Sequence, residues 1–217
     1  MAQSLNYTST PVADRLAPLR TAVQAFTALA DGKADEARFL TEGRDILADL
    51  IADDNWLEDD FRQTHPQFYQ QYLLYCDPHQ RFSIQSFVWG PGQATPVHDH
   101  TVWGLVGVLQ GAERCERFRQ TPQGFVADGG PVLLERGQVD AVSPTVGDIH
   151  KVSNAFEDRT SISIHVYGAN IGSTPRHVFD VGTGLVKDFV SGYSSSRLPN
   201  IWDQTAMVRA QLAQAAR

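Results

Sequence analysis

Short β-rich runs separated by glycine and proline fill the middle of this 217-residue chain, from about Tyr69 to Tyr167. Turn signals such as Pro91-Gly92 interrupt the runs before a helix of ordinary length could form. Many short strands at regular spacing are typical of a sandwich or a barrel. The predicted strands are Phe82–Trp89, Val102–Val108, Glu113–Arg119, Val132–Leu134, Val139–Val142 and Ser161–Tyr167.

In the first third of the chain the apolar residues have the spacing of helices rather than of strands. Apolar residues recur there at three- and four-residue steps, which predicts one helix from Val12 to Ala30 and a second from Ala34 to Ile51. Asp31-Gly32 provides the turn between them. A shorter acidic segment follows at about Trp56 to Phe61.

The predicted organisation is one domain in three parts. Residues 1–68 form a helical segment packed on the barrel, because no linker-like stretch separates the two. Residues 69–200 form the barrel itself. Residues 201–217 are rich in Ala and Gln and form a C-terminal helix, with Asp203 as its N-cap.

Composition excludes several classes of partner. A formal net charge of -7 argues against nucleic acid and against anionic membranes, since both require a basic face. The sequence has neither an apolar run of transmembrane length nor a secretory signal pattern. Cys76 and Cys115 then read as reduced thiols, and we expect a cytoplasmic protein. The sequence does not indicate an oligomeric state.

A His-x-His pair carries the clearest chemical signal. Side chains two apart in an extended strand point the same way, so His98 and His100 present two imidazoles to one side. His150 follows about 50 residues later in a similar setting and is the expected third ligand of a metal site.

The glycines around these histidines resemble the two cupin motifs. Gly92 and Gly111 frame the histidine pair at the spacing of the first motif, except that Gly104 replaces its usual glutamate. Gly147, His150 and Asn154 match the end of the second motif. The resemblance implies a mainly β fold, a cupin (double-stranded β-helix, or jelly-roll) barrel with the N-terminal α-helices packed on it.

Three imidazoles favour iron, nickel, copper or zinc over magnesium or calcium, which prefer oxygen ligands. Three protein ligands also leave coordination positions open, as catalytic sites do. Because no carboxylate joins the set, a divalent ion would keep its full +2 charge and could accept an anionic substrate.

The run from Ser161 to Tyr167 alternates strictly between apolar and polar residues. Its polar face carries Ser163, His165 and Tyr167, which can pass a proton along a row of hydrogen bonds. A polar strand face that simply meets water is the alternative interpretation.

Together, the stretches Pro96–Gly104, Gly147–His150 and Ser163–Tyr167 resemble the thiol dioxygenases, the cysteine dioxygenase family with its bacterial 3-mercaptopropionate branch. The resemblance covers roughly Tyr69 to Arg176. It implies one Fe(2+) per chain, held by His98, His100 and His150. It also implies catalytic roles for Ser163, His165 and Tyr167, with the phenol close to the iron.

Two departures from the animal enzymes point to the bacterial branch. Those enzymes crosslink a cysteine to the tyrosine that matches Tyr167, but this chain has Gly104 at the cysteine position, so no Cys-Tyr crosslink is expected. Their substrate-binding arginine is replaced by glutamine, either Gln70 or Gln71, of which we prefer Gln70. Arg176 matches a further arginine of the branch and could clamp a carboxylate.

The resemblance therefore implies oxidation of a small thiol carboxylic acid, 3-mercaptopropionate or L-cysteine, by O2 to its sulfinic acid. Two alternatives stay open from the sequence. One is a cupin enzyme of other chemistry, a zinc, nickel or manganese isomerase or hydrolase. The other is a ligand-binding sensor cupin, which would have no need of the row that ends in Tyr167.

Overall fold

The structure is a computed structural model that describes residues 14–122, 124–201, 208–209, 211 and 213–214. Its α-helices are α1 (Ala17–Asp31) and α2 (Glu36–Ile51), and its short 3-10 helices are η1 (Asp59–Phe61) and η2 (Ile171–Ser173). The strands are β1 (Gln70–Cys76), β2 (Ser83–Trp89), β3 (Val97–His98), β4 (Gly104–Gln110), β5 (Ala112–Thr121), β6 (Gly124–Ala127), β7 (Val132–Glu135), β8 (Val139–Val142), β9 (His150–Asn154), β10 (Ser161–Tyr167), β11 (Arg176–Phe179) and β12 (Val186–Phe189).

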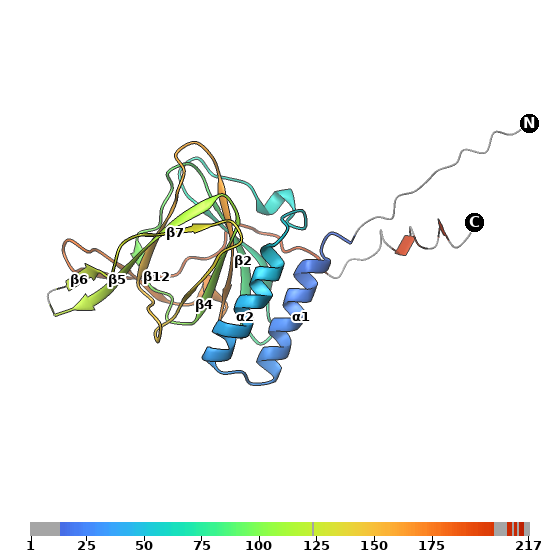
Figure 1. The fold of residues 1–217 in the computed structure, drawn as a ribbon, viewed down its shortest axis with the longest axis horizontal. Coiled ribbons are helices and arrows are strands. Elements are labelled where there is room, and N and C mark those ends of the chain that lie inside the picture. Colours follow the sequence, from blue (N-terminus) through green and yellow to red (C-terminus); the bar gives the residue numbers. More distant parts are fainter. Residues whose placement is uncertain (1–13, 123, 202–207, 210, 212, 215–217) are drawn as a thin grey trace, which may run out of the picture.

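The strands form two antiparallel sheets. One has the order β1-β2-β10-β4-β8, and the other runs β12-β11-β3-β9-β5-β6, with β7 also paired to β5. An interior cluster joins them, since Trp89 and Tyr167 of the first sheet pack with Val152 of the second. Two facing sheets connected by long crossovers make the predicted cupin barrel, with α-helices packed on one side (Figure 1).

Helices α1 and α2 lie side by side (Figure 1), and α2 packs against β4, β8 and β10. Asp35 caps α2 by accepting a hydrogen bond from the Arg38 backbone N–H at 3.0 Å. Gly107 of β4 allows a close approach, because a Cβ there would lie 2.9 Å from Ile51 Cδ1 and 3.0 Å from Leu47 Cγ. The helices thus form a dry layer against this sheet.

Strand β10 lies in the middle of the first sheet and is buried along its whole length. Its apolar side chains, Ile162, Ile164 and Val166, belong to the same core cluster as the helices. Its polar side chains must then face the barrel interior, because successive residues of a strand alternate. The alternation read from the sequence is therefore present, and its polar face does not meet water.

The elements differ from their predicted bounds in a few places. The first helix begins at Ala17 within the described residues, and the strand expected from Val102 begins at Gly104. Six strands were not predicted: β1, β3, β6, β9, β11 and β12. All but β1 are at most five residues long and polar or mixed in composition, so their local sequence carries little strand signal, and they form by pairing with segments distant in the chain. The predicted C-terminal helix with its Asp203 cap falls largely outside the described residues.

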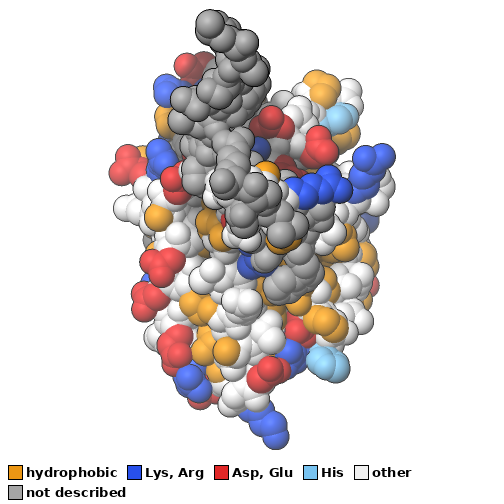
Figure 2. Space-filling view, turned by 90° about the vertical axis from the view of Figure 1, so that its right-hand side faces the viewer, with side chains coloured by type: hydrophobic (Ala, Val, Ile, Leu, Met, Phe, Trp, Pro, Cys, Tyr) orange, Lys and Arg blue, Asp and Glu red, His pale blue; other side chains and the backbone are white. Residues whose placement is uncertain are grey.

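The helical side of the molecule carries acidic and basic side chains interspersed with apolar ones (Figure 2). A lipid bilayer would require a longer and more apolar helix than any that the described residues form. Cys76 and Cys115 are both free thiols.

Candidate metal centre and adjoining cavity

Three histidines meet inside the barrel. His98 ends β3, His150 begins β9, and the two are register partners across the pair of strands. His100 follows two residues after His98, and its ring centroid lies 4.9 Å from that of His98 and 4.9 Å from that of His150. Their ligand atoms all lie within 4.8 Å of one another, and all three side chains are buried. The predicted trio is therefore a real cluster.

Each ring has a contact at Nδ1. His98 Nδ1 lies 3.0 Å from the Pro96 carbonyl, His100 Nδ1 lies 2.9 Å from Asp148 Oδ1, and His150 Nδ1 lies 3.5 Å from Cys115 Sγ. A carbonyl and a carboxylate require an N–H at Nδ1, which leaves the Nε2 lone pair of His98 and His100 free to bind a metal. The Nε2 atom of His100 is buried and has no hydrogen-bond partner.

Burial keeps the His98 and His150 rings neutral. Burial, reinforced by the neighbouring imidazoles, lowers the pKa of His98 to about 3 and lowers that of His150 well below its usual range. Burial alone would raise the pKa of Asp148, but hydrogen bonds from His100 and Thr101 lower it overall. The site therefore offers neutral nitrogen ligands with an ionised carboxylate behind one of them.

This donor set fits a transition-metal ion. Neutral imidazoles whose lone pairs converge in a dry pocket suit iron, zinc, copper or nickel, and an orphaned buried nitrogen is costly unless something binds it. The chain supplies three ligands, so a bound ion would retain positions for other molecules.

The polar face of β10 forms a continuous row beside this cluster. Ser163 Oγ lies 2.8 Å from His165 Nε2, and His165 Nδ1 lies 2.8 Å from the Tyr167 hydroxyl. The Tyr167 ring stacks on the His100 ring, with centroids 5.2 Å apart, so the phenol adjoins the metal site. Phe87 stacks on His165 with centroids 4.0 Å apart and holds the imidazole in place.

Burial also keeps this row uncharged. It lowers the pKa of His165 well below the usual range and raises the pKa of the Tyr167 phenol. At neutral pH, His165 is therefore an imidazole with one N–H, and Tyr167 keeps its proton.

Gly104 lies directly opposite Tyr167 in the register of β4 and β10. A Cβ at Gly104 would lie 2.6 Å from Tyr167 Cδ1, so the position adjoins the ring edge and has no room for a side chain without movement. The site thus has a glycine at the place from which a cysteine could reach the phenol ring.

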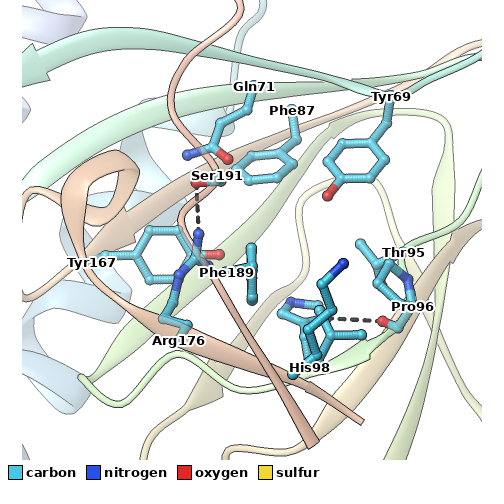
Figure 3. A pocket seen from close by; sticks show the side chains of 12 residues that line it. Tyr69, Gln71, Phe87, Thr95, Pro96, His98, Tyr167, Arg176, Phe189 and Ser191 are labelled. Carbon is cyan, nitrogen blue, oxygen red and sulfur yellow. Dashed lines mark hydrogen bonds between the residues drawn. The ribbon is translucent and has the colours of Figure 1, made fainter. Parts of the chain in front are cut away.

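A cavity of about 220 Å³ opens onto the cluster (Figure 3). His98 and Tyr167 line its inner end, and Tyr69, Phe87 and Arg176 contribute to its walls. Such a volume is below the roughly 300–1,000 Å³ of drug-sized pockets, so the cavity suits a molecule of few atoms.

Arg176, at the start of β11, places an unpaired positive charge in this cavity. Its Nη2 donates to Ser191 Oγ at 2.6 Å, and its guanidinium lies over the Phe189 ring, 4.6 Å from the centroid. Its Nε is buried without a partner, and no carboxylate among the described residues pairs with it. Burial lowers the pKa of Arg176, which remains a cation. A buried guanidinium without a counter-ion is a ready site for a ligand anion.

Of the two candidate glutamines, the structure places Gln71 in the cavity. Gln71 is buried, lines the cavity and has no partner for its Nε2. Gln70 points elsewhere, and its Nε2 donates to the Phe68 and Tyr69 carbonyls. The preferred residue Gln70 therefore lies outside the cavity and Gln71 inside it, because only one of two consecutive residues of β1 can face the interior.

Sequence reasoning missed several residues of the site. Tyr69 lines the cavity, Asp148 supports His100, and Cys115 contacts His150. Asp148 lies within the motif that contains His150 and could have been noticed there. Ser191 and Phe189 lie far along the chain in a stretch without any motif, so only the fold could reveal them.

Comparison with known proteins agrees with this geometry. Over 109 residues the chain is 28% identical to cysteine dioxygenase type 1 of Danio rerio, a match that covers 48% of this chain and 52% of that protein. The chain is similar to the thiol dioxygenases. It spans about half the length of the curated relative it matches, and no protein-family model matches it.

Several solved structures overlap part of the chain. A conserved protein with a double-stranded β-helix domain from Klebsiella pneumoniae aligns with 52% of this chain and 82% of its own, at 17% identity and a TM-score of 0.42. Oxalate oxidase aligns with 54% of this chain and 61% of its own, at 13% identity and a TM-score of 0.40. The assignment of the barrel here follows from its strand order, and the thiol dioxygenase resemblance from the curated relative.

Proposed function

We propose that this protein is an iron-dependent thiol dioxygenase that converts a small thiol carboxylic acid to its sulfinic acid. The observation that carries the proposal is one small cavity that reaches the cluster of three imidazoles at His98 and has the unpaired guanidinium of Arg176 in its wall. A short molecule with a thiolate at one end and a carboxylate at the other matches both.

The reaction balances without a further reductant. A thiol RSH and one O2 give RSO2H, with both oxygen atoms on sulfur. Bound ferrous iron would supply the redox chemistry that O2 requires and a positive charge that favours the thiolate. His98, His100 and His150 are the residues that would hold it.

The other residues bind and orient the substrate. Arg176 would clamp the carboxylate, and the free Nε2 of Gln71 would donate a further hydrogen bond to it. Tyr167, held by His165, would contact the sulfur end by hydrogen bonding. Phe87 and Tyr69 close the walls with aromatic surface and limit access of water.

The cavity favours 3-mercaptopropionate over L-cysteine. Its lining contains two cations, Arg176 and Lys187, and no carboxylate that could pair with an α-ammonium group. Burying an ammonium beside an arginine without a counter-charge is unfavourable. We therefore place the protein functionally with the 3-mercaptopropionate branch.

The test is oxygen uptake by iron-loaded protein with 3-mercaptopropionate, L-cysteine and cysteamine, with sulfinate measured by NMR. We expect one O2 consumed per sulfinate formed and the highest kcat/KM for 3-mercaptopropionate. Arg176→Ala should raise the KM for the two acids and leave that for cysteamine, which has no carboxylate, unchanged. The proposal fails if protein that holds stoichiometric iron oxidises none of the three, or if the purified protein retains zinc and rejects iron.

A further inference from the structure

Glu113 of β5 is a fully buried acid that belongs to neither the histidine cluster nor the cavity wall. Its Oε1 accepts one long hydrogen bond, from Ser161 Oγ at 3.5 Å, and its Oε2 has no partner. No cation among the described residues forms an ion pair with it. Burial of a carboxyl without a counter-charge lowers the stability of the fold, so its presence in the interior calls for an explanation.

The carboxyl lies at the end of the polar row of β10. Ser163 and Trp89 are its other polar neighbours, and both interact with it. The Trp89 indole N–H donates to Ser163 Oγ at 3.3 Å, and the same Ser163 oxygen lies 2.8 Å from His165 Nε2. Glu113, Ser163, His165 and Tyr167 therefore follow one another toward the cavity.

Two hydrogen-bond directions are open to this row when the Glu113 carboxyl and the neighbouring Ser163 hydroxyl share a hydrogen bond. A carboxylate accepts only, so an ionised Glu113 takes the Ser163 proton, and Ser163 then accepts from His165 Nε2–H. His165 Nδ1 must in turn accept the Tyr167 proton. The phenol oxygen then offers only lone pairs to the cavity.

A protonated Glu113 reverses every bond. Its O–H donates to Ser163, which frees the Ser163 proton for His165 Nε2 and leaves the imidazole proton on Nδ1. His165 Nδ1–H donates to the phenol oxygen, so the Tyr167 O–H points into the cavity. In both arrangements Ser163 still accepts from Trp89, so the Ser163 hydroxyl is satisfied in either one.

We propose that Glu113 is a positioning residue whose protonation sets the direction of this row and so decides whether Tyr167 donates or accepts in the cavity. The switch of direction is a property of the chain alone. Its effect on catalysis rests on the proposed function, in which a donating phenol would stabilise an anionic ligand beside it.

Among Glu113, Ser163, His165 and Tyr167, Glu113 is the group that gains or loses a proton near neutral pH. Burial raises its pKa to about 7, although Ser163, Trp89 and Ser161 oppose the rise. From β9 and β7 its register partners are Asn154 and Leu134, neither of which titrates.

The titratable groups nearest to the carboxyl stay neutral at the same pH. On its own strand, burial raises the pKa of Cys115 to about 12. On β10, burial lowers the pKa of His165 and raises that of Tyr167. The row can therefore respond to Glu113 by exchanging tautomers rather than by becoming charged.

The direct test is 15N NMR of the imidazole nitrogens in metal-free protein, with the His165 signals assigned from a His165→Gln variant. We expect the Nε2–H tautomer at about pH 8.5 and the Nδ1–H tautomer at about pH 5.5, with a midpoint near 7. In Glu113→Gln the tautomer should not change with pH. Glu116→Gln, on the same strand but 35% exposed and paired with Lys151, is the matched control and should behave as wild type.

Two results would overturn the proposal: a wild-type His165 tautomer that is constant across this range, or an exchange that persists in Glu113→Gln. If that variant does not fold, infrared spectroscopy of the wild type replaces it. A protonated-carboxyl band from a buried acid must disappear as the pH rises through neutrality, and its absence at low pH refutes the switch. Since neither measurement uses iron or thiol, failure of the dioxygenase proposal would leave the result unaffected.

Discussion

The two faces of β10 are equally buried and chemically opposite. Ile162, Ile164 and Val166 are at most 2% exposed and pack under the helices, while the row that ends in Tyr167 is at most 3% exposed inside the barrel. Apolar contacts are non-directional, so the outer face needs only the right volume. The inner face needs specific donors and acceptors at specific distances. One strand thus separates the part of the molecule that stabilises it from the part that does chemistry.

The energetics of the two faces should differ in the same way. Each buried aliphatic side chain contributes roughly 1.5–3 kcal/mol by leaving water. A buried hydrogen bond contributes about 1 kcal/mol net, because it replaces bonds to water. Mutations on the outer face should therefore lower the free energy of unfolding and leave metal binding and turnover unchanged. Mutations on the inner side should impair metal binding or turnover and change stability less.

The largest effect is expected on the inner side, at the histidine cluster. His100→Ala removes a ligand that the fold cannot replace, so iron affinity should fall by more than about 100-fold and thiol oxidation should be lost. The thermal unfolding temperature of the metal-free protein should change little. Iron content after anaerobic loading and calorimetry measure the two effects. His79→Ala, an exposed histidine, is the control and should retain full iron binding.

On the outer face, Ile164→Ala should lower the free energy of unfolding by about 2–5 kcal/mol, because it opens a cavity in a layer that is fully buried. Iron binding and the KM for thiol should stay at wild-type values in the folded fraction. Urea unfolding measures the loss. Leu133→Ala, whose side chain is about half exposed, should change stability by less than about 0.5 kcal/mol. A large change in KM for Ile164→Ala would contradict the separation of the faces.

Burial of Glu113 on the inner side makes the free energy of unfolding depend on pH. Its pKa is raised to about 7, above the usual 4.5, so between these values the folded chain binds more protons than the unfolded chain. Its contribution to stability is therefore full below pH 4.5 and is lost as the pH rises through 7. Glu113→Gln should match wild type at acid pH and exceed it at pH 8 by up to about 3 kcal/mol. Unfolding curves at both pH values test this, and equal differences at the two would refute it.

The smallest effect is expected from Tyr167→Phe, which removes one hydroxyl and keeps the ring on His100. Turnover of the iron-loaded protein should fall about tenfold, the equivalent of one lost hydrogen bond in the transition state. Stability should change by less than about 1 kcal/mol. Steady-state kinetics with 3-mercaptopropionate provides the measurement. Unchanged kcat would mean that the phenol has no part in the reaction.

Much of this arrangement could be read from local patterns. The strict alternation in β10, the two helices and the spacing of His98, His100 and His150 were all visible in the sequence, because each reflects a short-range geometric period. The choice between Gln70 and Gln71 was not, since an uncertainty of one residue in strand register reverses which side chain faces inward. Strands such as β3 and β9 were missed because they form by hydrogen bonding to segments distant in the sequence, and their own residues show little alternation.

The sequence by itself determined which chemical groups are available: three imidazoles in a cupin-like frame, an alternating polar row and a glycine opposite the phenol. Only the tertiary structure decided that Arg176 lacks a counter-ion, that Gln71 enters the cavity and that Glu113 ends the row. The physical reason is that burial and pairing depend on segments far apart in the chain. Whether a charge is compensated, and what its pKa becomes, is set by neighbours that folding brings together.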